Sequence, residues 1–183
     1  PQAYKPVSAT YLAERGLRAV SDGVGGAIVA YEATWLEGPK KGDVDLFAQR
    51  IDGEGRALWN EGAPVALASS DWTERTLTLV PDGEGGAIAT FGLVPPAAHL
   101  STDTALGAQR IGADGTLLWH LGERSAVLSA TPHAERAVST IADGRGGVMA
   151  FFEAHTRDGT HAGDIELVAQ RLDADGTRLW GQD

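Results

Sequence analysis

Residues 22–28 read DGVGGAI, and the same pattern returns as DGEGGAI at 82–88 and as DGRGGVM at 143–149. The spacing is 60 residues between the first two copies and 61 between the next two. Two further segments keep this spacing: AQR at 48–50, 108–110 and 169–171, and LW at 58–59, 118–119 and 179–180. A register held over a whole period indicates three tandem copies of one structural unit.

Each copy contains short segments typical of β-strands, joined by glycine-rich turns. In the first copy we predict strands at 17–21, 26–33 and 44–52, with a tight turn at DGVGG, where glycine supplies the positive φ of a hairpin. A turn at 53–55 leads into a predicted fourth strand at 56–59. No segment has the 3.6-residue apolar period of a helix, so the predicted class is all-β, with four antiparallel strands per copy.

Four-stranded antiparallel units repeated at this spacing are typical of the blades of a β-propeller. The predicted blades cover about 10–68, 69–129 and 130–183. Trp59, Trp119 and Trp180 fall at the same position of the three copies. An aromatic residue repeated in every blade most simply packs between neighbouring blades, and we assign the three tryptophans that role.

Three blades are fewer than the about four to eight of closed propellers, so ring closure is expected to need a second chain. The segment PVALA at 64–68 follows Trp59, no such segment follows Trp180, and a similar PVSA lies at 6–9. We therefore predict a homodimer with six blades, in which residues 1–9 of each chain complete the third blade of the other. The alternative is a monomer with pseudo-threefold symmetry, a β-prism or a β-trefoil.

The segments DGVGGAI (22–28), DVDLFAQR (43–50) and LDADGTRLW (172–180) resemble the repeats of bacterial secreted or surface β-propellers of uncharacterised function. This resemblance spans nearly the whole chain and implies a propeller fold and an extracellular or cell-surface location, without an activity. The hairpin at 173–180 is also similar to the tryptophan-docking repeat of quinoprotein dehydrogenase propellers. No residues match the calcium-ligating acids and the stacking tryptophan of those enzymes, so no cofactor is implied.

Composition excludes several classes of function. The net charge of −10 and the pI near 4.9 argue against a nucleic-acid partner, because such binding depends on Lys and Arg. The absence of cysteine excludes disulfides, thiolate zinc sites and a cysteine nucleophile. No apolar run approaches the about 20 residues of a membrane span, so no membrane insertion is expected. No metal site is predicted.

The loops at 34–42, 94–102 and 155–163 have one length but unlike compositions, and variable loops on a rigid scaffold commonly carry binding. Candidate contact residues in these loops are Trp35, His99, His155, Arg157, Asp158 and His161. Repeated Arg15, Arg75 and Arg136 precede the predicted innermost strands, where they could form an anion site at the channel mouth or pair with neighbouring acids. Repeated Asp43, Asp103 and Asp164 could ligate calcium or accept backbone N–H groups.

The leading hypothesis is a non-enzymatic scaffold or binding module that assembles with itself and binds a glycan or a protein. A second hypothesis is a glycosidase or lyase that uses carboxylates from several blades at the channel mouth. A third is an engineered or excised repeat fragment with no biological ligand. The predicted inner strands carry Thr, Ser, Leu and Val, not acids unique to one copy, which favours the non-enzymatic hypothesis.

Overall fold

The computed structural model describes residues 5–8, 10–95, 104–119, 126–129, 134–156, 160 and 162–181, with only the backbone of Thr76 and Ala137. These residues form antiparallel β-sheets and one short 3₁₀ turn, Asn60–Gly62, and no α-helix lies within those ranges. The all-β prediction is confirmed.

The strands form three sheets, each from one sequence repeat and each a simple meander. Sheet 1 contains β1 (Ala13–Ser21), β2 (Ala27–Thr34), β3 (Val44–Ile51) and β4 (Val65–Ala68). Sheet 2 contains β5 (Thr73–Pro81), β6 (Ala87–Val94), β7 (Ala105–Ile111) and β8 (Ala126–Ser129). Sheet 3 contains β9 (Ala134–Ala142), β10 (Val148–His155) and β11 (Ile165–Leu172).

The predicted fourth strand at 56–59 is wrong. This segment forms one isolated bridge, Ile51 with Ala57, and the strand that pairs with β3 is β4. The reason is the side chain of Gln49, whose Oε1 accepts the Trp59 N–H at 2.9 Å and whose Nε2 donates to the Ala63 carbonyl at 2.7 Å. The Gln49 side chain thus bonds the Trp59 N–H and the Ala63 carbonyl, which are then not used for strand pairing. The chain therefore leaves the sheet after Ala57 and returns as β4.

The repeated DGxGG segment is a turn held by its aspartate. Asp22 Oδ1 accepts the N–H groups of Val24 and Gly26 at 3.0 and 2.8 Å, and Asp82 and Asp143 repeat these contacts in the other sheets. These backbone hydrogen bonds, the one from Val24 first, hold the pKa of Asp22 below its usual value. The arginine of each AQR segment also forms an ion pair with the turn aspartate of its own sheet, as Arg50 does with Asp22 at 2.9 Å.

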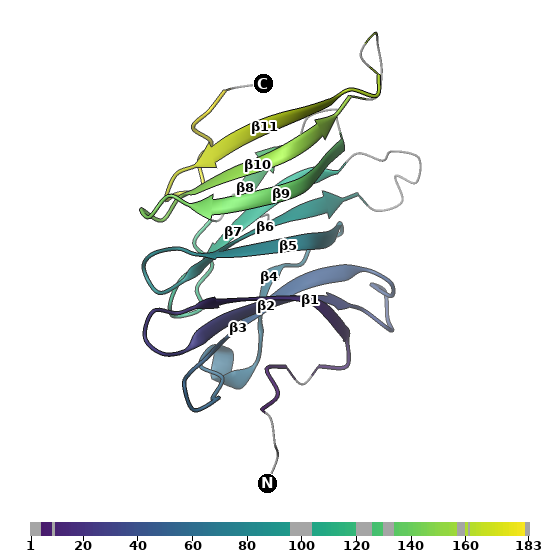
Figure 1. Cartoon of the computed structure of the whole chain (residues 1–183). Coiled ribbons are helices and arrows are strands. Elements are labelled where there is room, and N and C mark those ends of the chain that lie inside the picture. Colours follow the sequence, from purple (N-terminus) through teal and green to yellow (C-terminus); the bar gives the residue numbers. More distant parts are fainter. Residues whose placement is uncertain are drawn as a thin grey trace.

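The three sheets stack face to face in chain order, with β1 beside β5 and β5 beside β9, and the first and last described residues lie at opposite ends of the stack (Figure 1). One apolar core lies between sheets 1 and 2 and includes Ile28, Leu46, Leu77 and Phe91. A second core lies between sheets 2 and 3 and includes Ile88, Leu106, Val148 and Phe152. Sheet 2 is therefore apolar on both faces.

A tryptophan from one sheet docks on a turn of the next. Trp59 Nε1 donates to the Ala113 carbonyl at 3.0 Å, and a Cβ on Gly115 would lie 2.8 Å from the Trp59 ring. Trp119 repeats both contacts with Ala174, at 2.8 Å, and with Gly176. The predicted packing role is confirmed for Trp59 and Trp119. Two independent reasons favour glycine at position 115: its φ of +88° disfavours any side chain, and the docked Trp59 ring leaves no space for one.

The docking contact predicts the cost of filling Gly115. Gly115→Ala should lower the free energy of unfolding by roughly 2–4 kcal/mol, because a strained φ and a clash with the Trp59 ring add together. Gly38→Ala is the matched control: its φ is +76°, but a Cβ there would meet nothing within 4 Å, so only the strain of about 1–2 kcal/mol applies. Urea unfolding measures both, and equal losses would show that Trp59 does not constrain the turn.

Candidate functional site

The outer face of sheet 3 exposes positions that are buried in sheets 1 and 2. Leu46 and Leu106 are 0% and 2% exposed, whereas Leu167, at the same repeat position, is 85% exposed. Trp59 and Trp119 are 2% and 1% exposed, whereas Trp180 is 43% exposed. We call the face formed by Phe151, Leu167, Ala169 and Trp180 the donor face. Its groove also includes Ser139, Glu153 and Val168.

Leucines next to the tryptophans show that this exposure is not a general property of the third repeat. Leu58, Leu118 and Leu179 are 46%, 43% and 47% exposed, so this position is at the rim of every sheet. The tryptophan positions differ only where no further sheet follows in the described chain. A contiguous apolar face of this kind marks an interaction surface more often than scattered single residues do.

The opposite end of the stack carries the counterpart of this face. Leu17 of sheet 1 is 59% exposed, although Leu77, its equivalent in sheet 2, is buried in the core between sheets. The turn at 53–55 is equivalent to the turns at 113–115 and 174–176 that receive Trp59 and Trp119. We call Leu17, Ile51 and this turn the acceptor face. The aliphatic stem of Lys5 lies against Gly55, where tryptophan rings lie against Gly115 and Gly176.

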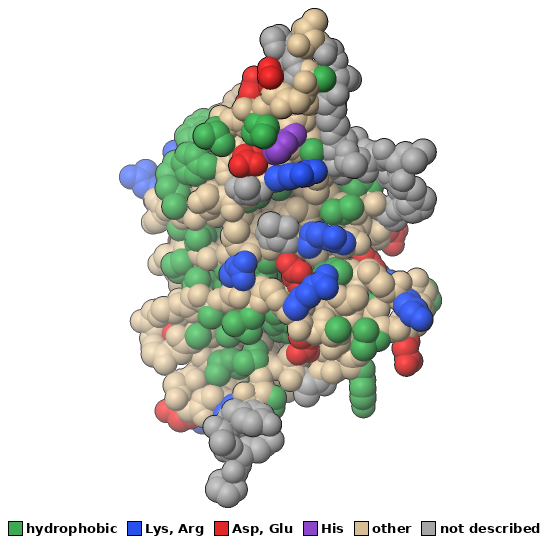
Figure 2. Space-filling model, turned by 45° about the vertical axis from the view of Figure 1, so that its right-hand side comes forward, with side chains coloured by type: hydrophobic (Ala, Val, Ile, Leu, Met, Phe, Trp, Pro, Cys, Tyr) green, Lys and Arg blue, Asp and Glu red, His purple; other side chains and the backbone are tan. Residues whose placement is uncertain are grey.

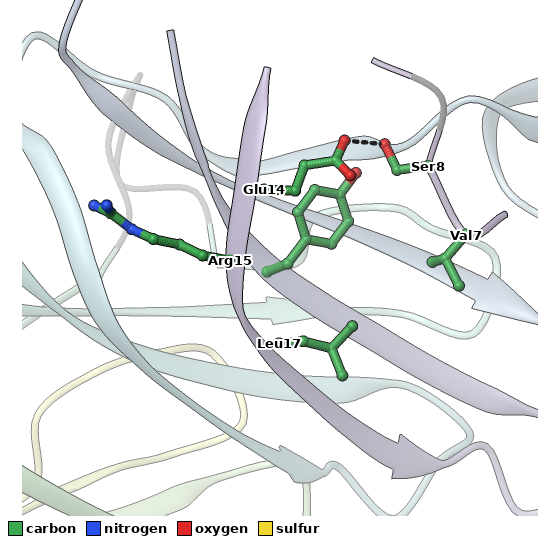
Figure 3. Close-up of a pocket in the computed structure, with 6 residues that line it drawn as sticks. Val7, Ser8, Glu14, Arg15 and Leu17 are labelled. Carbon is green, nitrogen blue, oxygen red and sulfur yellow. Dashed lines mark hydrogen bonds between the residues drawn. The ribbon is translucent and has the colours of Figure 1, made fainter. Parts of the chain in front are cut away.

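A pocket beside the acceptor face is lined by Val7, Ser8, Glu14, Arg15, Leu17 and Tyr31. Figure 3 shows Val7, Ser8 and Leu17 on one side of β1 and the Arg15 side chain pointing to the other side. The Ser8 hydroxyl donates to Glu14 at 2.5 Å. Ser70 makes the same contact with Glu74, and Ser129 with Glu135, so each of these glutamates joins its strand to the segment that precedes it.

Glu74 lies in an environment that changes its ionisation. It is buried, and its Oε2 has no hydrogen-bond partner among the described residues. Burial is the main cause that raises the pKa of Glu74 to about 7; the nearby Asp45 and Asp43 carboxylates also raise this pKa, and the hydrogen bonds from Ser70 lower it. The hydrogen bond from a preceding serine recurs at Glu14 and Glu135, so this contact is part of the repeated structure.

The structure describes two of the six loop residues predicted to form a contact surface. Trp35 Nε1 donates to buried Asp45 at 2.7 Å, which fixes this side chain to its own sheet. His155 lies 3.1 Å from Glu153 at the end of β10, in a different sheet from Trp35. His99, Arg157, Asp158 and His161 lie outside the described residues.

Of the repeated aspartates, Asp43 accepts the Val44 N–H at 2.9 Å, which is one of the two roles that the sequence suggested for it. It also accepts a hydrogen bond from the Thr73 hydroxyl at 2.8 Å. Asp103 lies outside the described residues.

The repeated arginines lie on the neighbouring strands β1, β5 and β9, and Figure 2 shows Lys and Arg side chains at successive heights along one face of the stack. Arg15 forms an ion pair with Glu32 at 3.3 Å. Pairing with a neighbouring acid was the predicted alternative to an anion site. Arg75 lies opposite Gly92 in the register, so no acid faces it across the strand pair. Arg136 lies opposite Glu153, the carboxylate that His155 contacts.

Comparison with protein-family models, curated proteins and solved structures returned no match to this chain. Within the described ranges no group of three or more His, Asp or Glu could hold a metal ion. Among the same residues, no helix has the length and apolarity to span a membrane.

Sequence reasoning singled out loops and arginines and missed Phe151, Leu167 and Leu17. The signal that could have found them is the repeat alignment itself. Leu167 aligns with Leu46 and Leu106, so a repeat without a neighbour on that side must expose it.

Glu74 predicts a pH dependence of stability. Its pKa is about 7 in the folded chain and 4.5 without the fold, so between these values the folded state holds a proton that the unfolded state has lost. The free energy of unfolding should therefore fall as the pH rises from about 5 to 7, by at most about 1.4 kcal/mol per pH unit. Chemical unfolding of the wild type and of Glu74→Gln, which cannot titrate, isolates this contribution. Parallel curves for the two proteins would contradict it.

Proposed function

We propose that this chain is a non-enzymatic, self-assembling β-propeller scaffold, in which each sheet is one blade and two copies close a six-bladed ring. Sheets that follow one another in chain order, with their first strands side by side, are the arrangement expected of blades (Figure 1). The first and last described residues lie at opposite ends of the stack, which favours blades over a β-prism or a β-trefoil monomer, whose three units would close on themselves.

The observation that carries the proposal is the exposure of the donor face. Leu167 and Trp180 occupy positions that are almost fully buried in the two preceding repeats. Burial of one large apolar side chain stabilises an assembly by about 1.5–3 kcal/mol, so leaving this face in water is costly. A partner that covers it is the simplest reason for keeping apolar residues there.

A second copy is the partner that fits both ends. Among the described residues, Trp180 of sheet 3 has no receiving turn, and the receiving turn at 53–55 in sheet 1 has no tryptophan. One contact repeated between copies would therefore continue the interface that already joins sheets 1 and 2 and sheets 2 and 3. Such a head-to-tail contact forms a closed ring when the rotation permits, and six blades lie within the about four to eight of known propellers.

Binding of a glycan or a protein at one rim of the ring is part of the proposal. The arginines on β1, β5 and β9 and the variable loops would line that rim. An extracellular or cell-surface location follows from the resemblance of the repeats. The raised pKa of Glu74 is the one observation that favours an enzyme, and its hydrogen bond to Ser70 already explains why the residue is there.

Trp180→Ala tests the proposal. Loss of a central docking tryptophan should weaken association by about 2 kcal/mol or more, which is roughly 30-fold in the dimer dissociation constant. Leu179→Ala is the matched control. Leu179 is as exposed as Leu58 and Leu118, whose sheets already have a neighbour, so covering the donor face is not expected to bury it. Sedimentation equilibrium measures both variants.

A dimer that both variants weaken equally would show that Trp180 does not dock. A wild-type chain that stays monomeric at high micromolar concentration would refute the six-bladed ring.

A further inference from the structure

We infer that residues 5–8 of one copy form the fourth strand of sheet 3 in the second copy, paired with the outer edge of β11. This inference rests on the proposed self-assembly and specifies a contact that tryptophan docking alone does not require. It makes the interface an exchange of strands between copies, in which each chain completes the last blade of the other.

Among the described residues, the outer edge of β11 has no strand like the fourth strand of sheets 1 and 2. In sheet 1, β3 pairs with both β2 and β4, and in sheet 2, β7 pairs with both β6 and β8. In the described part of sheet 3, β11 pairs with β10 alone. The unpaired N–H and C=O groups of such an edge are a template for a strand from another chain.

Residues 5–8 align with β4 and β8 in the sequence repeat, and two hydrogen bonds place them accordingly. Ser8 donates to Glu14, six residues on, as Ser129 of β8 donates to Glu135. Thr10 donates to Glu14, four residues on, as Ser70 donates to Glu74. The segment that follows residue 8 therefore already meets sheet 1 in the way that the chain leaving β4 meets sheet 2.

The residue types also suit the position. Val7 aligns with Leu67 and Leu128, which are both buried in the cores between sheets. Pro6 and Lys5 are types that natural proteins place on outer strands, where a missing N–H and a charge discourage further pairing. The segment can thus fill the edge of β11 and close it.

Lys5 connects strand exchange with tryptophan docking. Its stem lies at the place on Gly55 that a docked tryptophan occupies on Gly115 and Gly176. Trp180 of the second copy can dock there only when Lys5 moves away, and pairing of residues 5–8 with β11 moves it. The registers of β3 with β4 and of β7 with β8 place Lys5 opposite Ala169, because Val65 lies opposite Ala48 and Ala126 opposite Ala108.

Disulfide trapping tests this register, and the chain has no cysteine of its own. Directly opposed residues of antiparallel strands have Cα atoms about 4.5–5.5 Å apart, within the range of a disulfide. Lys5→Cys and Ala169→Cys variants, mixed and mildly oxidised, should give a covalent dimer at a yield at least about tenfold above either variant alone. Lys5→Cys mixed with Glu166→Cys is the matched control, since Glu166 is an exposed residue of the same strand outside this register.

The outcomes separate the two proposals. A yield that matches the control, in a protein that is still dimeric by sedimentation and still weakened by Trp180→Ala, would refute strand exchange and leave the scaffold proposal intact. Monomers that neither cross-link nor respond to Trp180→Ala would refute both.

Discussion

A sheet that is apolar on both faces cannot be stable alone in water, and this constraint governs the whole chain. Sheet 2 meets it with a neighbour on each side, and the contact is the same on both: a tryptophan ring over a glycine turn, with the indole N–H donating to a backbone carbonyl. The ring excludes any side chain at Gly115 and Gly176, so the pairing depends on the sequence of both sheets. In the part of the chain that the structure describes, the outermost faces of sheets 1 and 3 have no such neighbour, and Leu17, Leu167 and Trp180 are exposed there.

Repetition separates two kinds of residue. Those that hold one sheet together, such as Asp22 with its turn and Gln49 with Trp59, have the same partners in the other copies. Those that pack between sheets, such as Leu46 and Trp59, keep their chemistry in the last copy, where the equivalent Leu167 and Trp180 are exposed. The difference in exposure arises from the position of the sheet in the stack and not from the residue type. Residues that are buried in two copies and exposed in the third therefore indicate an interaction surface.

The sequence repeat was sufficient to predict the all-β class, the glycine turns and the docking of Trp59 and Trp119, because each depends on contacts that recur in every copy. It failed at 56–59, where the apolar Leu58 and Trp59 indicated a strand but the Gln49 side chain takes the backbone hydrogen bonds. The contact role of Trp35 stays a prediction, but its hydrogen bond to the buried acid Asp45 was not predicted. Neither partner could be inferred from spacing, since both contacts are made by side chains across a turn.

Strand pairing and tryptophan docking converge on one geometry for the proposed contact between copies. The most direct test is a crystal structure of the unmodified chain. Trp180 Nε1 should then lie within hydrogen-bond distance of the Gly53 carbonyl of another copy, as Trp59 and Trp119 lie from Ala113 and Ala174. A structure with Trp180 in solvent and the turn at 53–55 uncovered in every copy would contradict the requirement for a neighbour on both faces.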